Sequence, residues 1–386
     1  MGSEMEFDHR GVLMQPLISV ILPTYNGSRW LRSSIESCLF QSYQNFELIL
    51  VDDCSTDGTS PIIEHYSRLD SRIRVIRNEA NMKLPASLNK GFALARGEYF
   101  TWTSDDNLFA KDALQVLLDN IRSTGSDIIY SSYHFINESG GRLEKFAGVP
   151  EEILFKCVVG ACFLYKRTVH EQLGGYDVTK FRMEDMDFWL RALPRFKTSF
   201  IDHPLLYAYR KHTNSLTSSL YSDGEKYREY RRNHFESFKT FFNEELQACL
   251  SDEEIELHVE LYFEDIVNNK NLNFAITEKV LKYINLFNRL LLVNWQSIGL
   301  DPAVVQKTIG DKRDKIVSLV LNDLIFANKM LLKENPKLAR QLNRPISWYY
   351  KEYEVLPLWF KRLGHIVKIL QNNRSWRSIF SDRTNL

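Results

Sequence analysis

Two segments near the start of the chain set its architecture: LISVILPTYN at residues 17–26 and FELILVDDCSTDG at residues 46–58. Each is a short apolar run that ends in polar residues, as expected of strands buried on both faces of a parallel sheet. Between the two runs, Leu31, Ile35 and Leu39 recur at helical spacing. A strand, a helix and a second strand predict a right-handed βαβ unit.

The alternation of strands and helices continues along the first half of the chain. The pattern predicts further strands at 73–76, 98–103, 161–165 and 205–209, and helices at 86–95 and 184–193. Residues 137–141, Asn-Glu-Ser-Gly-Gly, predict a hairpin turn. This order of elements favours an α/β fold, a Rossmann-like three-layer α/β/α sandwich.

Composition excludes several classes of protein. The 386 residues include 49 basic and 49 acidic ones, so the net charge is zero, which argues against a nucleic-acid-binding protein. Residues 1–15 lack an apolar core and are expected to form a flexible arm rather than a secretory signal. The five cysteines form no Cys-x-x-Cys pair, which favours a reducing, cytoplasmic location over a disulfide scaffold.

The second half of the chain differs from the first. Glycine becomes scarce after about residue 222, and apolar stripes at helical spacing predict a mostly α-helical domain over residues 223–386, after a catalytic domain over 16–222. From Arg340 onward there are nine basic and three acidic residues, an excess of six positive charges. Residues 356–370 read as a basic amphipathic helix, so a peripheral contact with the inner face of the cell membrane is one interpretation. Packing on the catalytic domain and homo-oligomer formation are the others.

Paired acidic residues follow two of the predicted strands. Asp52-Asp53 ends the second strand and Asp105-Asp106 ends the fourth, while Glu184-Asp185 opens a later helix. Ligands of open α/β sheets bind at the carboxyl ends of the strands. Neighbouring carboxylates repel each other unless a positive group lies between them, and a divalent cation with phosphate ligands meets that need. Helix capping and surface solvation remain the alternatives for each single pair.

Five motifs occur in an order that is familiar from one enzyme family. They are Pro23-Thr24-Tyr25-Asn26, the run from Val51 to Thr59, Ala95-Arg96-Gly97-Glu98-Tyr99 with Ser104-Asp105-Asp106-Asn107, Gly174-Gly175-Tyr176-Asp177 with the run from Glu184 to Arg191, and the run from Tyr209 to Thr217. In this order and spacing the chain resembles the family 2 glycosyltransferases, inverting enzymes with the GT-A fold. The resemblance covers roughly residues 17–217.

The resemblance implies a role for each matched residue on the donor side. Residues 23–25, Pro23, Thr24 and Tyr25, would line the nucleotide-binding pocket. Asp53 would accept a hydrogen bond from the base, usually uracil, which offers an N–H donor. Asp105 would contact the ribose, and Asp106 would bind Mn²⁺ or Mg²⁺ together with the donor diphosphate. Many family members carry an acid where this chain has Thr103.

The remaining candidates belong to the chemistry of transfer. By resemblance, Asp185 is the catalytic base, and Glu184 either orients its loop or takes its place. His212 is a second candidate metal ligand, Arg210 a candidate for the diphosphate, and Lys83 a candidate for the donor, with solvated surface as the alternative for these basic groups. Trp102 would line the acceptor cleft, unless it packs in the core.

These roles imply a metal-dependent hexosyl- or related transferase that uses a nucleotide sugar, by resemblance a UDP-sugar. The acceptor would be a hydroxyl of a glycan or of a lipid-linked saccharide in bacterial surface polysaccharide biosynthesis. A processive synthase is disfavoured because no Gln-x-x-Arg-Trp motif follows Asp185. A sugar-nucleotide pyrophosphorylase is disfavoured because the glycine-rich loop after the first strand is missing. A catalytically inactive nucleotide-sugar-binding or scaffold protein stays open, although Asp106 and Asp185 argue against it.

Overall fold

The computed structural model describes residues 15–216, 223–263 and 275–316. The chain divides into two compact units, Met1–Tyr262 with Asn294–Val305, and Phe263–Val293 with Gln306–Leu386. The first unit extends past residue 222, where a domain boundary is predicted, because helices α8 (Gly224–Thr240) and α9 (Asp252–Tyr262) belong to it. Residues 1–14 of the predicted arm and the predicted membrane-contact segment 356–370 lie outside the described residues.

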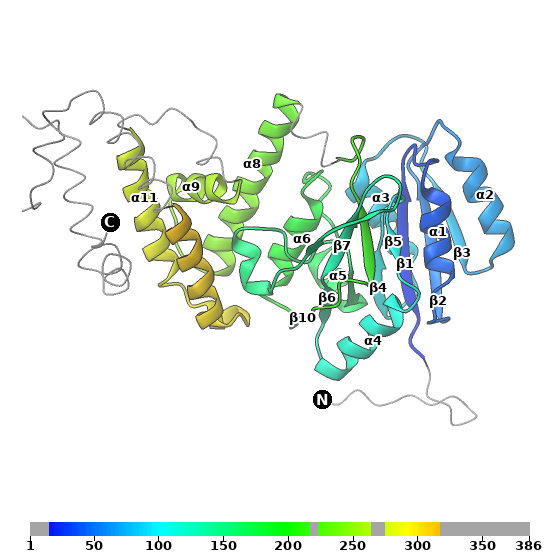
Figure 1. Ribbon diagram of the computed structural model, residues 1–386, viewed down its shortest axis with the longest axis horizontal. Coiled ribbons are helices and arrows are strands. Elements are labelled where there is room, and N and C mark those ends of the chain that lie inside the picture. The colour runs from blue at the N-terminus through cyan, green and yellow to red at the C-terminus, as the bar shows by residue number, and fades with distance from the viewer. Residues whose placement is uncertain (1–14, 217–222, 264–274, 317–386) are drawn as a thin grey trace, which may run out of the picture. The chain divides into compact units, whose positions relative to one another are not determined.

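A seven-stranded sheet forms the centre of the first unit (Figure 1). In spatial order its strands are β10 (Thr198–Ile201), β6 (Ile128–Ser131), β9 (Phe163–Lys166), β4 (Tyr99–Trp102), β1 (Ile18–Thr24), β2 (Phe46–Asp52) and β3 (Ile73–Arg77). Strand β1 runs parallel to both β2 and β4, which confirms the predicted βαβ arrangement. Only β9 among these strands runs antiparallel to its neighbours, β4 and β6.

Helices cover both faces of this sheet, so the predicted three-layer sandwich is confirmed. Alternate residues of β1, Ile18, Val20 and Leu22, pack into one buried cluster with helices α1 (Leu31–Leu39), α2 (Thr59–Leu69) and α4 (Ala113–Thr124). On the opposite face lies helix α3 (Leu84–Leu94). A Cβ at Gly91 of α3 would come within 2.5 Å of Ile21, so a small residue at this position lets the helix approach the sheet closely.

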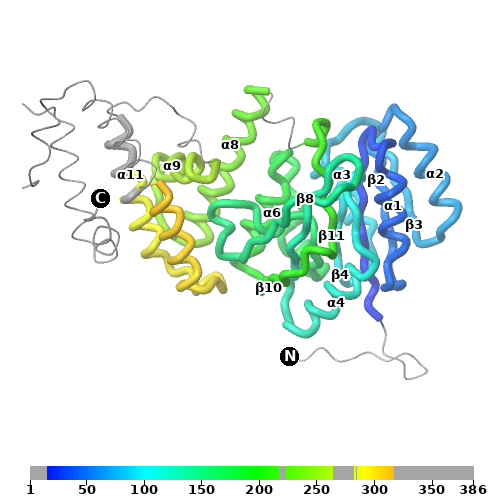
Figure 2. The backbone as a smooth tube through the Cα atoms, in the orientation of Figure 1, coloured from blue at the N-terminus to red at the C-terminus, as the bar shows by residue number. Residues whose placement is uncertain are grey.

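A second, four-stranded sheet has the order β5 (Leu108–Phe109), β11 (Tyr207–Arg210), β7 (Tyr133–Ile136) and β8 (Arg142–Phe146). The predicted strand at 205–209 and the predicted turn at 137–141 are both found in it, whereas the sheet itself was not predicted. Strand β5 pairs antiparallel with β11. This pairing brings the segment just before β5 next to the segment just after β11, although the two are far apart in the sequence. Figure 2 traces the backbone in the same orientation, with β11 labelled.

Further elements lie around these sheets. They include the short helix η1 (Pro150–Leu154), α5 (Arg167–Leu173), α6 (Glu184–Ala192), the π-helical turn η2 (Phe241–Glu245) after α8, α11 (Ala275–Leu290) and η3 (Trp295–Ile298), and residues 302–316 are also helical. Helix α6 is the predicted helix at 184–193. Across the described residues, no helix is both long enough and apolar enough to cross a bilayer.

Candidate active site at the strand ends

The loop that follows β2 is anchored by Asp52, which is 2% exposed. Its Oδ1 accepts a hydrogen bond from the backbone N–H of Ser55 at 2.9 Å, and its Oδ2 accepts one from the hydroxyl of Ser60 at 2.9 Å. The guanidinium of Arg77 lies 3.7 Å from Oδ2. Both carboxylate oxygens of Asp52 are therefore used to fix the loop to the start of α2.

Asp53, the next residue, organises the loop after β3. Its Oδ1 accepts hydrogen bonds from the side-chain amide of Asn78 and the backbone N–H of Met82, both at 2.8 Å. Its Oδ2 accepts one from the backbone N–H of Lys83 at 2.9 Å. Lys83 has a φ of 72°, a region that non-glycine residues seldom occupy, so this bond helps to hold an unfavourable backbone. A carboxylate offers about four acceptor positions, which leaves room for one more donor on Oδ2.

Asp105 lies against the end of β1. The hydroxyl of Thr24 donates to Oδ2 of Asp105 at 2.5 Å. A Cβ at Gly27 would lie 1.9 Å from the same oxygen, so only glycine allows the loop after β1 to pass this close. Burial, followed by the charge of neighbouring Asp106, raises the pKa of the Asp105 carboxyl to about 7.

Asp106 and His212 meet because β5 pairs with β11. The Nε2 of His212 lies 2.9 Å from Oδ2 of Asp106. Within the described part of the chain, Oδ1 of Asp106 and Nδ1 of His212 are buried without a hydrogen-bond partner. An unpaired buried acceptor is costly, and a bound cation would satisfy it.

The donor set also suits a divalent cation. A carboxylate oxygen and an imidazole nitrogen are ligands that Mn²⁺ accepts, while Mg²⁺ favours the oxygen. Over residues 15–216, 223–263 and 275–316, no group of three or more His, Cys, Asp or Glu side chains is arranged to hold a metal ion. Asp106 and His212 would therefore hold the cation only together with ligands from elsewhere, such as the oxygens of a diphosphate.

Arg210, the last residue of β11, is bonded to the backbone around this pair. Its Nε donates to the carbonyl oxygen of Asp106 at 2.9 Å, and its Nη1 donates to the carbonyls of Asn137 at 3.2 Å and Glu138 at 3.0 Å. The residue is 5% exposed. Arg210 thus joins the Asp106 segment to the β7–β8 turn, and its role at the diphosphate stays a prediction.

Glu184 and Asp185 begin helix α6. Glu184 is 4% exposed, and its Oε2 has no partner among the residues described. Burial, followed by the charge of Asp185, raises the pKa of Glu184 to about 8, and burial also raises the pKa of Asp185. The backbone N–H of Met186 donates to Oδ1 of Asp185 at 2.7 Å. Two adjacent desolvated carboxyls resist simultaneous ionisation, so the pair favours a state with one retained proton.

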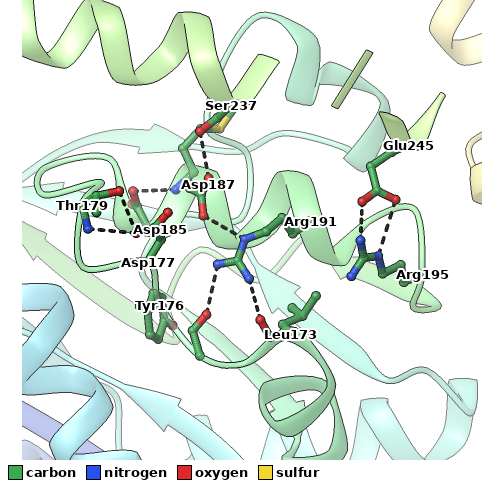
Figure 3. Close-up of polar contacts among 12 residues, drawn as sticks. Leu173, Tyr176, Asp177, Thr179, Asp185, Asp187, Arg191, Arg195, Ser237 and Glu245 are labelled. Carbon is green, nitrogen blue, oxygen red and sulfur yellow. Dashed lines mark hydrogen bonds and ion pairs between the residues drawn. The ribbon is translucent and has the colours of Figure 1, made fainter. Parts of the chain in front are cut away.

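Asp187 fixes the orientation of α6, as Figure 3 shows. Its Oδ2 accepts a hydrogen bond from Nε of Arg191 at 2.8 Å, and its Oδ1 accepts one from the hydroxyl of Ser237 in α8 at 2.8 Å. The same guanidinium donates to the carbonyls of Leu173 at 2.9 Å and Gly175 at 3.0 Å. Helix α6 is therefore tied both to α8 and to the turn that precedes it.

Trp102 has the contacts of a core residue. Its Nε1 donates to the hydroxyl of Tyr176 at 2.8 Å, and its ring packs edge-on against Phe163. Tyr176 is itself held by Asn89, whose side-chain amide makes hydrogen bonds of 2.7 and 2.9 Å to the Tyr176 backbone. These contacts support the packing interpretation of Trp102; the acceptor contact stays a prediction.

The other predicted donor residues surround the same strand ends. Pro23 and Thr24 are buried in β1, whereas the side chain of Tyr25 is 49% exposed. The side chain of Lys83 is exposed, and its Nζ lies 5.9 Å from the ring centroid of Phe181. The geometry thus pairs Thr24 with Asp105, Asp53 with the Lys83 backbone, and Asp106 with His212.

Trp30 and Asn78 are neighbours of these groups that the sequence did not indicate. Trp30 precedes α1, and its ring centroid lies 4.5 Å from that of His212. Asn78 donates to Asp53 and lies 3.0 Å from the hydroxyl of Ser87. Neither residue lies in one of the acidic strand ends, so no signal in the sequence singled them out.

Comparison with known proteins gives the family. Residues 19–174 match the family described as "Glycosyl transferase family 2". A Bacillus subtilis protein described as the teichuronic acid biosynthesis glycosyltransferase TuaG is 31% identical over 229 residues, which is 57% of this chain and 91% of TuaG. The Bacillus subtilis glycosyltransferase EpsE is 36% identical over 186 residues, which is 46% of this chain and 66% of EpsE.

Solved structures show the same fold. Staphylococcus aureus TarS, residues 1–349 in complex with UDP-GlcNAc, aligns with a TM-score of 0.53 and 18% identity, covering 79% of this chain and 92% of TarS. The likeness confirms the predicted GT-A fold with additional C-terminal helices. The match to TuaG, at 31% identity over 91% of its length, together with the family match over residues 19–174, shows that the chain belongs to glycosyl transferase family 2.

Proposed function

We propose that this glycosyltransferase moves a sugar, with inversion, from a UDP-sugar to a hydroxyl of a glycan or lipid-linked acceptor in bacterial surface polysaccharide biosynthesis. The observation that carries the proposal is the Asp106–His212 pair, with an unpartnered buried Oδ1, next to the Thr24–Asp105 contact. The name of TuaG refers to teichuronic acid biosynthesis, and TarS was solved with UDP-GlcNAc. Both support the substrate class.

Uracil is the base that the surroundings of Asp53 favour. Oδ1 of Asp53 already accepts two hydrogen bonds and Oδ2 accepts one. One further donor can be accommodated, which suits the single N–H on the pairing edge of uracil. Guanine presents an N–H and an amino group side by side and would need both oxygens. We therefore propose UDP rather than GDP as the leaving group.

The cation site is proposed at Asp106 and His212. When bound, Mn²⁺ or Mg²⁺ would neutralise charge on the departing diphosphate. Asp106 contributes Oδ1, which is not engaged elsewhere among the residues described, and His212 contributes Nε2 once it separates from Oδ2. Asp105 lies beside this pair and would accept a hydrogen bond from a ribose hydroxyl.

Asp185 is proposed as the base. The oxygen of the acceptor hydroxyl forms a bond to the anomeric carbon while the bond from that carbon to the diphosphate oxygen breaks on the opposite face. The hydroxyl proton passes to the Asp185 carboxylate. Burial raises the pKa of Asp185, which makes its carboxylate a better proton acceptor than an exposed aspartate. Glu184 retains the proton that the pair shares and so leaves Asp185 ionised.

Variants of the base test the proposal. Asp185→Asn should bind UDP and Mn²⁺ with unchanged affinity, measured by calorimetry, and should lose transfer to the acceptor. Asp177→Asn, at a neighbouring carboxylate that accepts hydrogen bonds from the backbone and hydroxyl of Thr179, serves as the matched control and should keep transfer. Normal turnover by Asp185→Asn would overturn the assignment of the base. Absence of any UDP-sugar turnover by the wild type would favour the inactive binding protein instead.

A further inference from the structure

We propose that Trp30 is a positioning residue, one that fixes the plane of the His212 imidazole beside Asp106 and thereby sets the divalent-cation affinity of the site. The proposal rests on the cation site assigned under the proposed function. Trp30 lies outside all the acidic motifs and precedes helix α1, on a segment of the chain remote in sequence from His212.

The first observation is that His212 lacks the usual support of a metal-binding histidine. Such a histidine ordinarily donates its second ring N–H to a carboxylate or carbonyl, which fixes the orientation of the ring. Here Nε2 forms a hydrogen bond with Oδ2 of Asp106 at 2.9 Å, but Nδ1 is buried and has no hydrogen-bond partner among the described residues. Once Nε2 turned from Oδ2 to a cation, no hydrogen bond among these residues would fix the imidazole plane, so another contact must do so.

The second observation is the aromatic contact that takes this place. The ring centroids of Trp30 and His212 are 4.5 Å apart, with an angle of 52° between the ring planes. Centroid distances of about 4.5–7 Å are those of favourable aromatic pairs. The His212 side chain is 7% exposed, so the indole covers a ring that would otherwise face solvent or move.

The third observation is that Trp30 is itself held by several elements. Its ring lies 4.2 Å from the Arg29 guanidinium and 5.4 Å from that of Arg210, both within the range of cation–π contacts. Arg29 forms a 2.7 Å ion pair with Glu138 in the β7–β8 turn. The segment before α1, the β7–β8 turn and the end of β11 thus converge on the indole.

Through these contacts the Trp30 indole holds both proposed cation ligands, Asp106 and His212, in place. Arg210 bonds the Asp106 backbone, and Trp30 packs against both Arg210 and His212. Removal of the indole would leave the imidazole without a fixed plane, and only a fraction of the molecules would present Nε2 to a cation. The apparent affinity for the cation falls by that fraction.

The test measures Mn²⁺ affinity, not turnover. Full-length wild type, Trp30→Ala, Trp30→Phe, His212→Ala and the Trp30→Ala/His212→Ala double variant are titrated with Mn²⁺ in the presence of UDP, and free Mn²⁺ is followed by electron paramagnetic resonance. Phe40→Ala is the matched control, because Phe40 flanks the other end of α1 and is 70% exposed. UDP binding in EDTA reports whether each variant keeps the nucleotide pocket.

We expect Trp30→Ala to weaken Mn²⁺ binding about tenfold, the effect typical of removing a residue that orients a metal ligand. Trp30→Phe should keep most of the wild-type affinity. The double variant should bind Mn²⁺ no more weakly than His212→Ala alone, because Trp30 acts through His212. Phe40→Ala should match wild type.

Four results would overturn the inference, and the first two concern Mn²⁺ binding by the variants. In the first, Trp30→Ala binds Mn²⁺ with an affinity within twofold of wild type while His212→Ala binds Mn²⁺ weakly. In the second, the double variant loses Mn²⁺ affinity by the product of the two single-variant factors. In either case the cation site itself stands. If wild type bound UDP but no Mn²⁺, the metal part of the proposed function and this inference would both fail. A loss of UDP binding in EDTA by Trp30→Ala alone would assign the indole to the nucleotide pocket and would also overturn it.

Discussion

The two aspartate pairs at the strand ends look alike in the sequence and differ in the structure. Asp52 and Asp53 together accept five hydrogen bonds, from Ser55, Ser60, Asn78, Met82 and Lys83. Asp105 accepts one from Thr24, and Asp106 meets His212 through one oxygen and leaves the other unpartnered within the described residues. The first pair builds loops, and the second remains available to a ligand.

The difference teaches which carboxylates can bind a cation. A carboxylate whose oxygens are filled by backbone and hydroxyl donors stabilises the fold, and its substitution should unfold a loop. A carboxylate that is buried without enough hydrogen-bond donors makes the folded state less stable, and a bound cation or a proton can offset this loss of free energy. Glu184 belongs with the second kind, because it is buried and its Oε2 has no partner in the part of the chain that the structure describes.

Asp106→Asn should have the largest effect and would sharpen the contrast. We expect kcat/KM for transfer to fall by at least about 100-fold, because a cation at a departing diphosphate contributes several kcal/mol. The thermal midpoint should stay near that of wild type, since Oδ1 of Asp106 has no partner to lose among the residues described. Steady-state kinetics and a thermal melt in EDTA measure the two quantities. A large drop in the melting temperature would show that Asp106 also builds the fold.

Glu184→Gln should change how stability depends on pH. The folded-state pKa of Glu184 is raised to about 8, so its neutral form is favoured by folding. Its contribution to stability is fully present below the ordinary value of 4.5 and is lost as pH rises through about 8. Wild type should lose stability relative to Glu184→Gln over this window, by on the order of a few kcal/mol. Denaturant melts at pH 5, 6.5 and 8 follow the difference, and parallel curves for the two proteins would contradict it.

Asp53→Asn should lose stability and nucleotide affinity together. An amide NH₂ would face either the Lys83 or the Met82 backbone N–H, and one buried donor would lose its acceptor. Such a loss costs about 1–3 kcal/mol. Urea unfolding gives the stability, and UDP calorimetry gives the affinity. If stability were unchanged while UDP binding disappeared, Asp53 would belong with the ligand-binding carboxylates. The distinction between the Asp52–Asp53 pair and the Asp105–Asp106 pair would then be wrong.

Ser60→Ala is the smallest of these tests. It removes one of the two hydrogen bonds to Asp52 and leaves the other, from Ser55, in place. We expect a loss of about 1 kcal/mol in the free energy of unfolding and no change in kcat. A fall in kcat beyond twofold would mean that the loop after β2 acts in transfer itself.

Much of the large sheet could be predicted from the sequence. Strands β1 and β2 are continuous apolar runs because both faces are covered by helices, and such runs are distinctive. The small sheet could not be predicted in the same way. Strand β5 has two residues, and β8 consists mainly of exposed ones, so neither carries a hydrophobic period.

The site shows the same division. The acidic residues were recognised from their motifs, but the meeting of Asp106 and His212 depends on the pairing of β5 with β11, which local patterns do not encode. Arg210 looked like a free cation in the sequence, and its bonds to three carbonyl oxygens are a tertiary feature. Trp30 reads as an ordinary helix-start aromatic until the fold places His212 beside it.

The anchoring of α6 has a consequence for recombination between family members. The segment that matches the family ends at residue 174, before Asp185, and Asp187 is bonded to Ser237 in α8. A chimera that exchanges residues 19–174 alone would therefore take the aspartates of the strand ends from one parent and Asp185, the proposed base, from the other. The Arg191 bond to the Leu173 carbonyl would then cross the junction. The natural unit of exchange is longer and ends beyond α8.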